Sequence, residues 1–314
     1  MPPEPPRVVT ALAPAKLNLD LRVLGRRPDG YHELASIFVG VSLFDTLTFR
    51  ARPDGDFRLT LRGGPPDVPA GADNLVLRAA SAMREAAARR GKRCGGADIT
   101  LHKRIPAQAG LGGGSSDAAA AVLALNRLCG LRLPKEVLHE VAAGLGSDVN
   151  FFVEGCRSAV CTGRGEIVRA TDCPGLQWFT ILKPSMSAAT RDVFSAFSAN
   201  FDGVPEFRPY RQFGQNVRMD DSGKRRGKFR NALQTPALQT TTGLDDWLRR
   251  VKAATRHGDW RMTGSGTGFF ASVATRRRAR RLARMAAAAD GPNRERTWAY
   301  VASPACVRLL DSAT

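Results

Sequence analysis

The chain has 314 residues, of which 43% are hydrophobic and 24% charged, and its 47 Lys and Arg outnumber 29 Asp and Glu to give a formal charge of +18. This length and composition fit one large or two ordinary globular domains and exclude a disordered chain. They also disfavour a membrane protein and a structural zinc site, because no apolar run approaches ~20 residues and the six cysteines form no C-x-x-C pair.

The N-terminal third predicts strands followed by a helix. Val8–Val23 predicts a half-buried strand, because Leu17, Leu19, Leu21 and Val23 alternate along it. Further along, we expect a hairpin of Leu43–Phe49 and Phe57–Leu61, a helix from Leu75 to about Arg90 capped by Asp73 or Asn74, and a strand over Ile99–Ile105.

A glycine-rich stretch, PAQAGLGGGSSDAAAA at 106–121, predicts a phosphate-binding loop. Glycine permits positive φ and a close backbone approach to a ligand, and the unpaired N–H groups at a helix N-terminus attract anions. A P-loop is excluded because no lysine follows the glycines, and the spacing does not fit a dinucleotide fingerprint. A tight turn without a ligand is the alternative, but four glycines in five positions exceed what a turn requires.

The rest of the chain mixes helices and strands without a regular βαβ alternation, which favours the α+β class. A polar, basic segment, Asn200–Arg230, is expected to be a long loop. The other predicted elements are a helix from the glycine loop to near Gly130, a helix from Pro134 with Gly144 as its C′ residue, a hairpin over Ser158–Val168 that turns at Gly163-Arg164-Gly165, a strand over Trp178–Leu182, a glycine-rich turn at Thr263–Gly268, a helix over about Thr275–Ala289 and a strand over Cys306–Leu310.

The strong positive charge is compatible with several classes of partner. It would concentrate nucleotides or phosphorylated metabolites, and it could equally bind nucleic-acid phosphates. We favour the interpretation that most of the arginines only solvate helix faces. The N-terminal segment MPPEPPRVVT lacks the features of a signal peptide, so we expect a cytoplasmic protein.

Four stretches together carry a resemblance. They are, in chain order, APAKLNLDLRVLGRRPDGYHEL, PAQAGLGGGSSDAAAA, GLGSDVNFF and MTGSGTGFF, and the chain resembles the GHMP small-molecule kinases in them. The DGYH element after AKLNL is similar to the branch whose acceptor is a cytidine diphosphate-linked methylerythritol. This resemblance implies a two-lobed fold with its site between the lobes, and ATP-dependent phosphorylation of the acceptor's 2-hydroxyl for isoprenoid precursors.

The resemblance also implies a division of the chain and two catalytic residues. Residues 1–170 would form the ATP-binding domain and 171–314 the substrate domain, with the last strand allowed to pack back on the first domain. Asp148 would accept the hydroxyl proton, and Lys16 would pair with it. Without the resemblance, Asp148 would be interpreted as a helix N-cap and Lys16 as a solvated strand lysine.

The remaining site residues follow from the same resemblance. Those expected to bind ATP are Pro106, Ala107, Gln108, Ala109, Gly110, Leu111, Gly112, Gly113, Gly114, Ser115, Ser116, Asn74, Leu75 and Lys103. Those expected to bind the acceptor are Asn18, Tyr31, His32, Phe194, Thr263, Gly264 and Ser265, with Asn231 as a weaker candidate. Tyr31 and His32 would recognise the cytosine, and Phe194 would be the second aromatic of a base sandwich. No acidic metal ligand stands out, so we expect Mg²⁺ on the ATP phosphates with help from Ser115 or Ser116.

Two alternatives remain open at this point. A sibling kinase of the same fold could act on mevalonate, homoserine or a sugar, although such acceptors offer no base for Tyr31 and His32. A basic nucleic-acid-binding protein on a degenerate kinase scaffold would explain the charge and the cluster at 224–228, but it would not need Lys16, Asp148 and the full glycine loop together.

Overall fold

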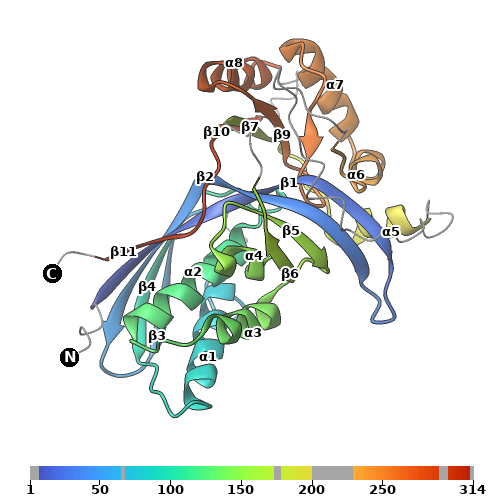
Figure 1. Ribbon diagram of the computed structural model, residues 1–314. Coiled ribbons are helices and arrows are strands. Elements are labelled where there is room, and N and C mark those ends of the chain that lie inside the picture. The colour runs from blue at the N-terminus through green and yellow to red at the C-terminus, as the bar shows by residue number, and fades with distance from the viewer. Residues whose placement is uncertain (1–6, 65–67, 173–177, 200–228, 290–295, 312–314) are drawn as a thin grey trace.

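The computed structural model describes residues 7–64, 68–172, 178–199, 229–289 and 296–311. These residues form two β-sheets with helices packed on them, so the α+β class is confirmed (Figure 1). The larger sheet has the order β11-β1-β2-β4-β3, and β5 and β6 extend it from β2. Its strands are β1 (Val8–Arg26), β2 (His32–Arg52), β3 (Phe57–Gly63), β4 (Gly96–Lys103), β5 (Ser158–Gly163), β6 (Ile167–Ala170) and β11 (Arg308–Asp311).

Four helices cover one face of this sheet: α1 (Leu75–Ala88), α2 (Gly113–Leu128), α3 (Lys135–Leu145) and α4 (Val149–Glu154). The helix α2 lies among the others, and its buried face is mostly alanine from Ala118 to Ala124. Such small side chains let α2 approach the sheet and its neighbours closely. The α1 helix begins at Asn74, whose side chain accepts a hydrogen bond from the Val76 amide, as expected of an N-cap.

The smaller sheet has the order β10-β7-β9-β8 and carries the C-terminal helices. Its strands are β7 (Trp178–Lys183), β8 (Arg261–Met262), β9 (Phe269–Val273) and β10 (Trp298–Ala302). The helices of this part are α5 (Thr190–Ala199), α6 (Gln234–Thr240), α7 (Leu244–Thr255) and α8 (Arg276–Ala287). None of the helices that the structure describes is long and apolar enough to cross a membrane.

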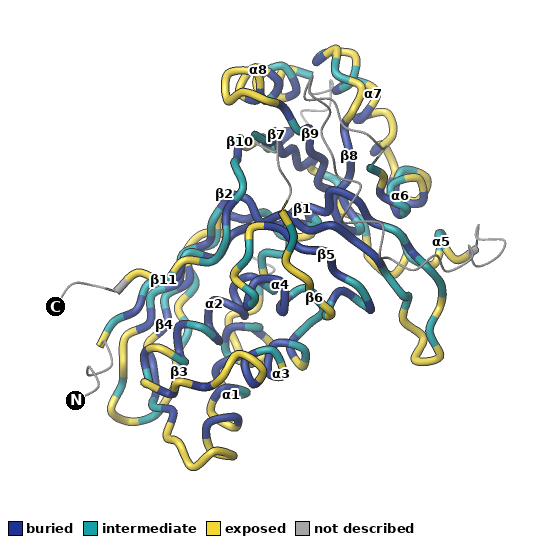
Figure 2. The backbone as a smooth tube through the Cα atoms, viewed as in Figure 1, coloured by how far each residue is buried: buried dark blue, intermediate teal, exposed yellow. Residues whose placement is uncertain are grey.

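The paired strands β1 and β2 run past both groups of helices, and their middle is buried (Figure 2). Along β1, Val9, Ala11 and Ala13 pack into the core with the helices α1–α4, whereas Leu17 and Leu19 pack against the smaller sheet. The face therefore switches between Ala13 and Leu17, where the pairing with β2 is irregular at Pro14/Ala15. The Lys16 side chain lies next to Asp148, at the start of α4, and the Asn18 side chain contacts the turn that joins β8 and β9.

Two local predictions are wrong. The strands β2 and β3 do not form a hairpin, because β4 lies between them and β3 pairs with β4 in parallel. The more buried β4 takes the interior position, and β3, which alternates between half-buried and exposed residues, takes the edge. Gly144 is not a C′ residue, since α3 continues to Leu145 and ends at Gly146. Most of the segment Asn200–Arg230, residues 200–228, lies outside the described residues.

Candidate active site

Two glycine-rich segments, the loop that begins at Gly110 and the turn at Thr263–Gly268, pack directly against each other. A Cβ on Gly110 would lie 2.1 Å from the Thr263 carbonyl oxygen, so only glycine fits at this crossing. The Gly268 amide donates to the Ala109 carbonyl at 3.1 Å, and the Lys16 amide donates to the Leu111 carbonyl at 2.8 Å. The predicted phosphate loop is therefore held between β1 and the turn at Thr263–Gly268.

Lys16 and Asp148 face each other beside these turns. The Lys16 Nζ donates to Asn18 Oδ1 at 2.7 Å and lies 3.3 Å from Asp148 Oδ2. Lys16 is only 4% exposed, and it also lies over the Phe38 ring, 4.8 Å from the centroid. Asp148 directly precedes α4 but makes no side-chain capping hydrogen bond. Its carboxylate, 26% exposed, is instead aimed at the lysine and the open space.

Asn18 links Lys16 to the second glycine turn. Its Oδ1 also accepts from the Gly264 amide at 2.8 Å, and its Nδ2 donates to Ser36 Oγ at 2.9 Å. The hydroxyl of Thr263 accepts from the Asn18 amide at 3.0 Å. Both polar atoms of the Asn18 side chain are thus hydrogen-bonded within the protein, and its Oδ1 fixes the position of the Lys16 ammonium.

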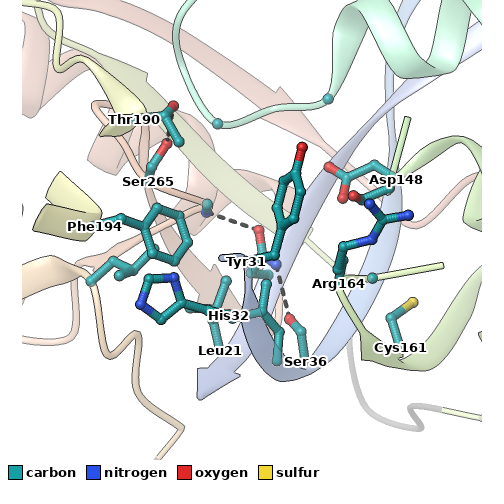
Figure 3. Close-up of a pocket in the computed structure, with 18 of the residues that line it drawn as sticks. Leu21, Tyr31, His32, Ser36, Asp148, Cys161, Arg164, Thr190, Phe194 and Ser265 are labelled. Carbon is teal, nitrogen blue, oxygen red and sulfur yellow. Dashed lines mark hydrogen bonds between the residues drawn. The ribbon is translucent and has the colours of Figure 1, made fainter. Parts of the chain in front are cut away.

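A cavity of about 840 Å³ opens in front of Lys16 and Asp148 (Figure 3). The expected acceptor-binding residues that line it are Asn18, Tyr31, His32, Phe194, Gly264 and Ser265. Thr263 does not line it, because its side chain is fully buried between Asn18 and Gly110. Asn231 also lies outside the lining, and its Nδ2 donates to the carbonyls of Met262 and Gly264.

Aromatic rings form the far wall of this cavity. The His32 and Phe194 rings are stacked with centroids 4.9 Å apart (Figure 3). The His32 Nε2 also lies 3.0 Å from Ser198 Oγ. Burial, together with the charge of Arg26, lowers the pKa of the His32 imidazole. Tyr31 is 57% exposed, and the Arg164 guanidinium lies over its ring at 5.0 Å. Tyr31 is therefore the exposed aromatic face of the wall.

A second cavity, of about 310 Å³, lies on the other side of the glycine loop. Its lining includes every residue expected to bind ATP except Ser115 and Ser116. Both cavities are lined by Gly110 and Gly112, so they meet at the loop. Ser116 is fully buried, and its hydroxyl has no hydrogen-bond partner among the residues that the structure describes.

A buried ion-pair cluster supports the floor of the second cavity. The Lys103 ammonium bridges the carboxylates of Asp45 and Asp117, and Asp45 also accepts the amide of Ile105 at 2.9 Å. Burial raises the pKa of Asp117 despite the neighbouring ammonium, whereas the two carboxylates raise the pKa of Lys103 against the effect of its burial. Lys103 therefore stays charged, and it joins β2, β4 and α2.

Sequence reasoning missed several residues of this site. Arg164 lines the larger cavity, and although its turn was foreseen as a hairpin turn, nothing local indicated that it faces Tyr31. Asp45 and Asp117 were not singled out, because their partner Lys103 is distant in sequence from Asp45. The signal that could have found Asp117 is its place in α2, three residues after the last glycine of the loop.

Comparison with known proteins agrees with this architecture. Residues 74–156 match the family model "GHMP kinases N terminal domain". The chain is 40% identical over 284 residues to 4-diphosphocytidyl-2-C-methyl-D-erythritol kinase of Heliobacterium modesticaldum, covering 85% of this chain and 87% of that protein. It is also 40% identical over 265 residues to the protein of the same name from Burkholderia thailandensis, covering 83% and 84%.

Solved structures extend the comparison. A crystal structure of 4-(cytidine 5'-diphospho)-2C-methyl-D-erythritol kinase matches with a TM-score of 0.73 and 34% identity, covering 94% of this chain and 99% of that one. Homoserine kinase from Cytophaga hutchinsonii matches with a TM-score of 0.70 and 18% identity, covering 97% and 98%. The second match, at such low identity, shows a shared fold.

Proposed function

The chain belongs to the 4-diphosphocytidyl-2-C-methyl-D-erythritol kinases, a family within the GHMP kinases, and we propose that Lys16 and Asp148 carry out its phosphoryl transfer. It is a small-molecule kinase that uses ATP to phosphorylate the 2-hydroxyl of 4-diphosphocytidyl-2-C-methyl-D-erythritol, a step toward isoprenoid precursors. The observation that carries the residue assignment is the Lys16–Asp148 pair at the place where the two cavities meet.

The reaction needs a base for the acceptor and positive charge for the moving phosphoryl group. Asp148 accepts the proton of the 2-hydroxyl while the hydroxyl oxygen bonds to the γ-phosphorus, and the bond from that phosphorus to the ADP oxygen breaks. Lys16 stabilises the charge on the transferred group. Asn18 orients Lys16 through the 2.7 Å hydrogen bond, which keeps the ammonium between the base and the glycine loop.

The ATP phosphates would lie along the first turn of α2. Gly112 precedes the helix with φ of 69° and no side chain, which leaves the first N–H groups of α2 open toward the second cavity. The acceptor would lie in the larger cavity, with its base near Tyr31, His32 and Phe194. We also propose that the enzyme acts in the cytoplasm.

A magnesium ion is part of this proposal. Among the described residues no group of three or more His, Cys, Asp or Glu side chains could hold a metal ion by itself. The donors present are hydroxyls of the first turn of α2, of which Ser115 is half-buried. Such a set suits an ion that is held mainly by ATP and keeps several waters. The ion would neutralise charge on the phosphates.

The direct test is transfer of the γ-phosphate of ATP by the purified protein. We expect phosphorylation of 4-diphosphocytidyl-2-C-methyl-D-erythritol in the presence of Mg²⁺, and much slower reaction with mevalonate, homoserine or galactose. Efficient phosphorylation of one of these siblings, without activity on the cytidylated acceptor, would overturn the assignment.

A second measurement tests the recognition of the base. Tyr31→Ala removes an exposed ring from the cavity wall, so the KM for the cytidylated acceptor should rise roughly tenfold, as expected for loss of ~1–3 kcal/mol of base stacking. The matched control is Ile167→Ala, which removes a side chain that is 60% exposed but outside the cavity lining. An unchanged KM in Tyr31→Ala would remove the stacking argument.

A further inference from the structure

A buried lysine, Lys183, contacts the chain segment that leads into the wall of the acceptor cavity. Lys183 is the last residue of β7, is 8% exposed and does not line either cavity. Its ammonium donates to the carbonyls of Pro184 at 2.8 Å and Met186 at 2.6 Å. No carboxylate of the described residues lies within ion-pair distance of it. Burial lowers the pKa of this ammonium to about 8, because the charged form loses its hydration inside the protein.

The two carbonyls belong to the connection between β7 and α5. This connection, residues 184–189, leads directly to Thr190 and Phe194, which line the cavity. The Met186 carbonyl accepts a second hydrogen bond, from Thr267 Oγ1 at 2.6 Å. One carbonyl oxygen thus joins β7, the start of α5 and the second glycine turn.

The same glycine turn also holds the reacting centre. Its Gly264 amide donates to Asn18, and Asn18 accepts from Lys16. A further tie joins the turn to α5, where Thr190 Oγ1 lies 2.8 Å from Ser265 Oγ. The N-terminal end of α5 is therefore tied to the turn that holds the reacting centre, and Lys183 supplies two hydrogen bonds to the connection that leads into this end.

We propose that Lys183 is a positioning residue that sets the distance between the base-binding wall on α5 and the phosphoryl-transfer centre. The inference rests on the proposed function, because an acceptor with a nucleotide base at one end and a reacting hydroxyl at the other must span that distance. A charged donor serves this purpose because its hydrogen bonds are about twice as strong as neutral ones. ATP binds on the other side of the glycine loop and does not depend on this distance.

The test compares the effect of a substitution on the KM for the acceptor with its effect on the KM for ATP. Lys183→Met keeps the length of the side chain and removes its donors, so the KM for the cytidylated acceptor should rise roughly tenfold, the loss expected for one charge-assisted hydrogen bond. The KM for ATP should stay close to that of the wild type. Lys183→Arg, which keeps the donors, should restore part of the acceptor KM. Lys135→Met, on the exposed side of α3, is the matched control.

Thr267→Val provides an independent arm, because it removes the other donor to the same carbonyl. We expect it to raise the acceptor KM as well, and we expect the double variant to differ from the sum of the two single effects. If Lys183→Met does not fold, an unchanged acceptor KM in Thr267→Val overturns the proposal. If Lys183→Met folds, equal changes in both KM values, or none, overturn it. Absence of wild-type activity on the cytidylated acceptor would instead refute the proposed function.

Discussion

The Lys16 ammonium lies 3.3 Å from Asp148 Oδ2, yet its 2.7 Å hydrogen bond goes to Asn18. The lysine is thus fixed by a neutral amide on its own strand, and the carboxylate keeps capacity to accept a proton from an acceptor. This division of partners distinguishes the pair from an ordinary buried salt bridge, in which the two charged groups satisfy each other.

The first prediction concerns the base. Asp148→Asn should lower kcat by about 10²–10⁴, the usual contribution of a general base, because the amide cannot take up the hydroxyl proton. The affinity for ATP should change little, since Asp148 lines the larger cavity and not the second one. Steady-state kinetics and nucleotide titration measure both. Asp98→Asn, at a half-exposed carboxylate paired with Arg52, is the control, and equal kcat values in the two variants would contradict the assignment.

The second prediction concerns the crossing of the two glycine turns. Gly110→Ala places a methyl group against the Thr263 carbonyl and must displace backbone on one side, so both stability and activity should be lost. Gly144→Ala is the matched control, because a Cβ there meets nothing within 4 Å and the position is helical. It should stabilise the protein by ~0.5–1 kcal/mol. Thermal unfolding compares them, and a Gly110→Ala protein of wild-type stability and activity would refute the tight crossing.

The third prediction concerns Lys103. Its side chain is 6% exposed and bridges Asp45 and Asp117, so Lys103→Met leaves two buried carboxylates without a counter-charge. We expect a loss of ~3–5 kcal/mol in the free energy of unfolding, against ~0–1 kcal/mol for the exposed pair lost in Lys135→Met. Urea titration measures both. Adding Asp117→Asn to Lys103→Met should recover part of the loss, and a further loss would contradict the role of charge.

The fourth prediction follows from the lowered pKa of His32. Its pKa in the folded protein lies below the reference value of 6.5, so the ring is neutral at pH 7 and gains a proton only in more acidic solution. Protonation would charge a ring stacked on Phe194 and close to Arg26. The acceptor KM should therefore be constant from about pH 8 to 6.5 and rise as the pH falls further. In His32→Gln, the rise of the acceptor KM at acidic pH should be much smaller. If the variant shows the same rise as the wild type, a group other than His32 is responsible for it.

The lowered pKa of His32 also makes the folding stability depend on pH. An unfolded chain binds a proton at His32 more readily than the folded chain, so folding stability falls as the pH drops through 6.5. The folded pKa marks the lower end of this window, below which the loss is complete. Comparing urea titrations of the wild type and His32→Gln over this range isolates the contribution of this ring.

The sequence predicted the features that depend on a few neighbouring residues. The alternation of Leu17, Leu19, Leu21 and Val23 predicted a buried face of β1, and all four side chains are buried. The Asn74 cap and the Gly163-Arg164-Gly165 turn followed from backbone preferences of a few neighbouring residues.

Long-range pairing could not be foreseen in the same way. The strand β3 follows β2 in the chain, but its partner β4 comes after α1, and nothing in either segment specifies the order. The helices α6 and α7 were missed entirely. The packing of Asp45 on Lys103 and of Lys183 on the Met186 carbonyl depends on how distant strands and loops come together, which single-sequence patterns do not contain.

The strands β1 and β2 contribute to all three hydrophobic clusters, so within the described part of the chain no boundary separates one half that could unfold alone. Loosening of the strand pair at one end would disturb the register of Lys16 and Asn18 in its middle. We therefore expect one cooperative unfolding transition. The larger cavity and the second cavity would form and disappear together, so a folded molecule would always carry both.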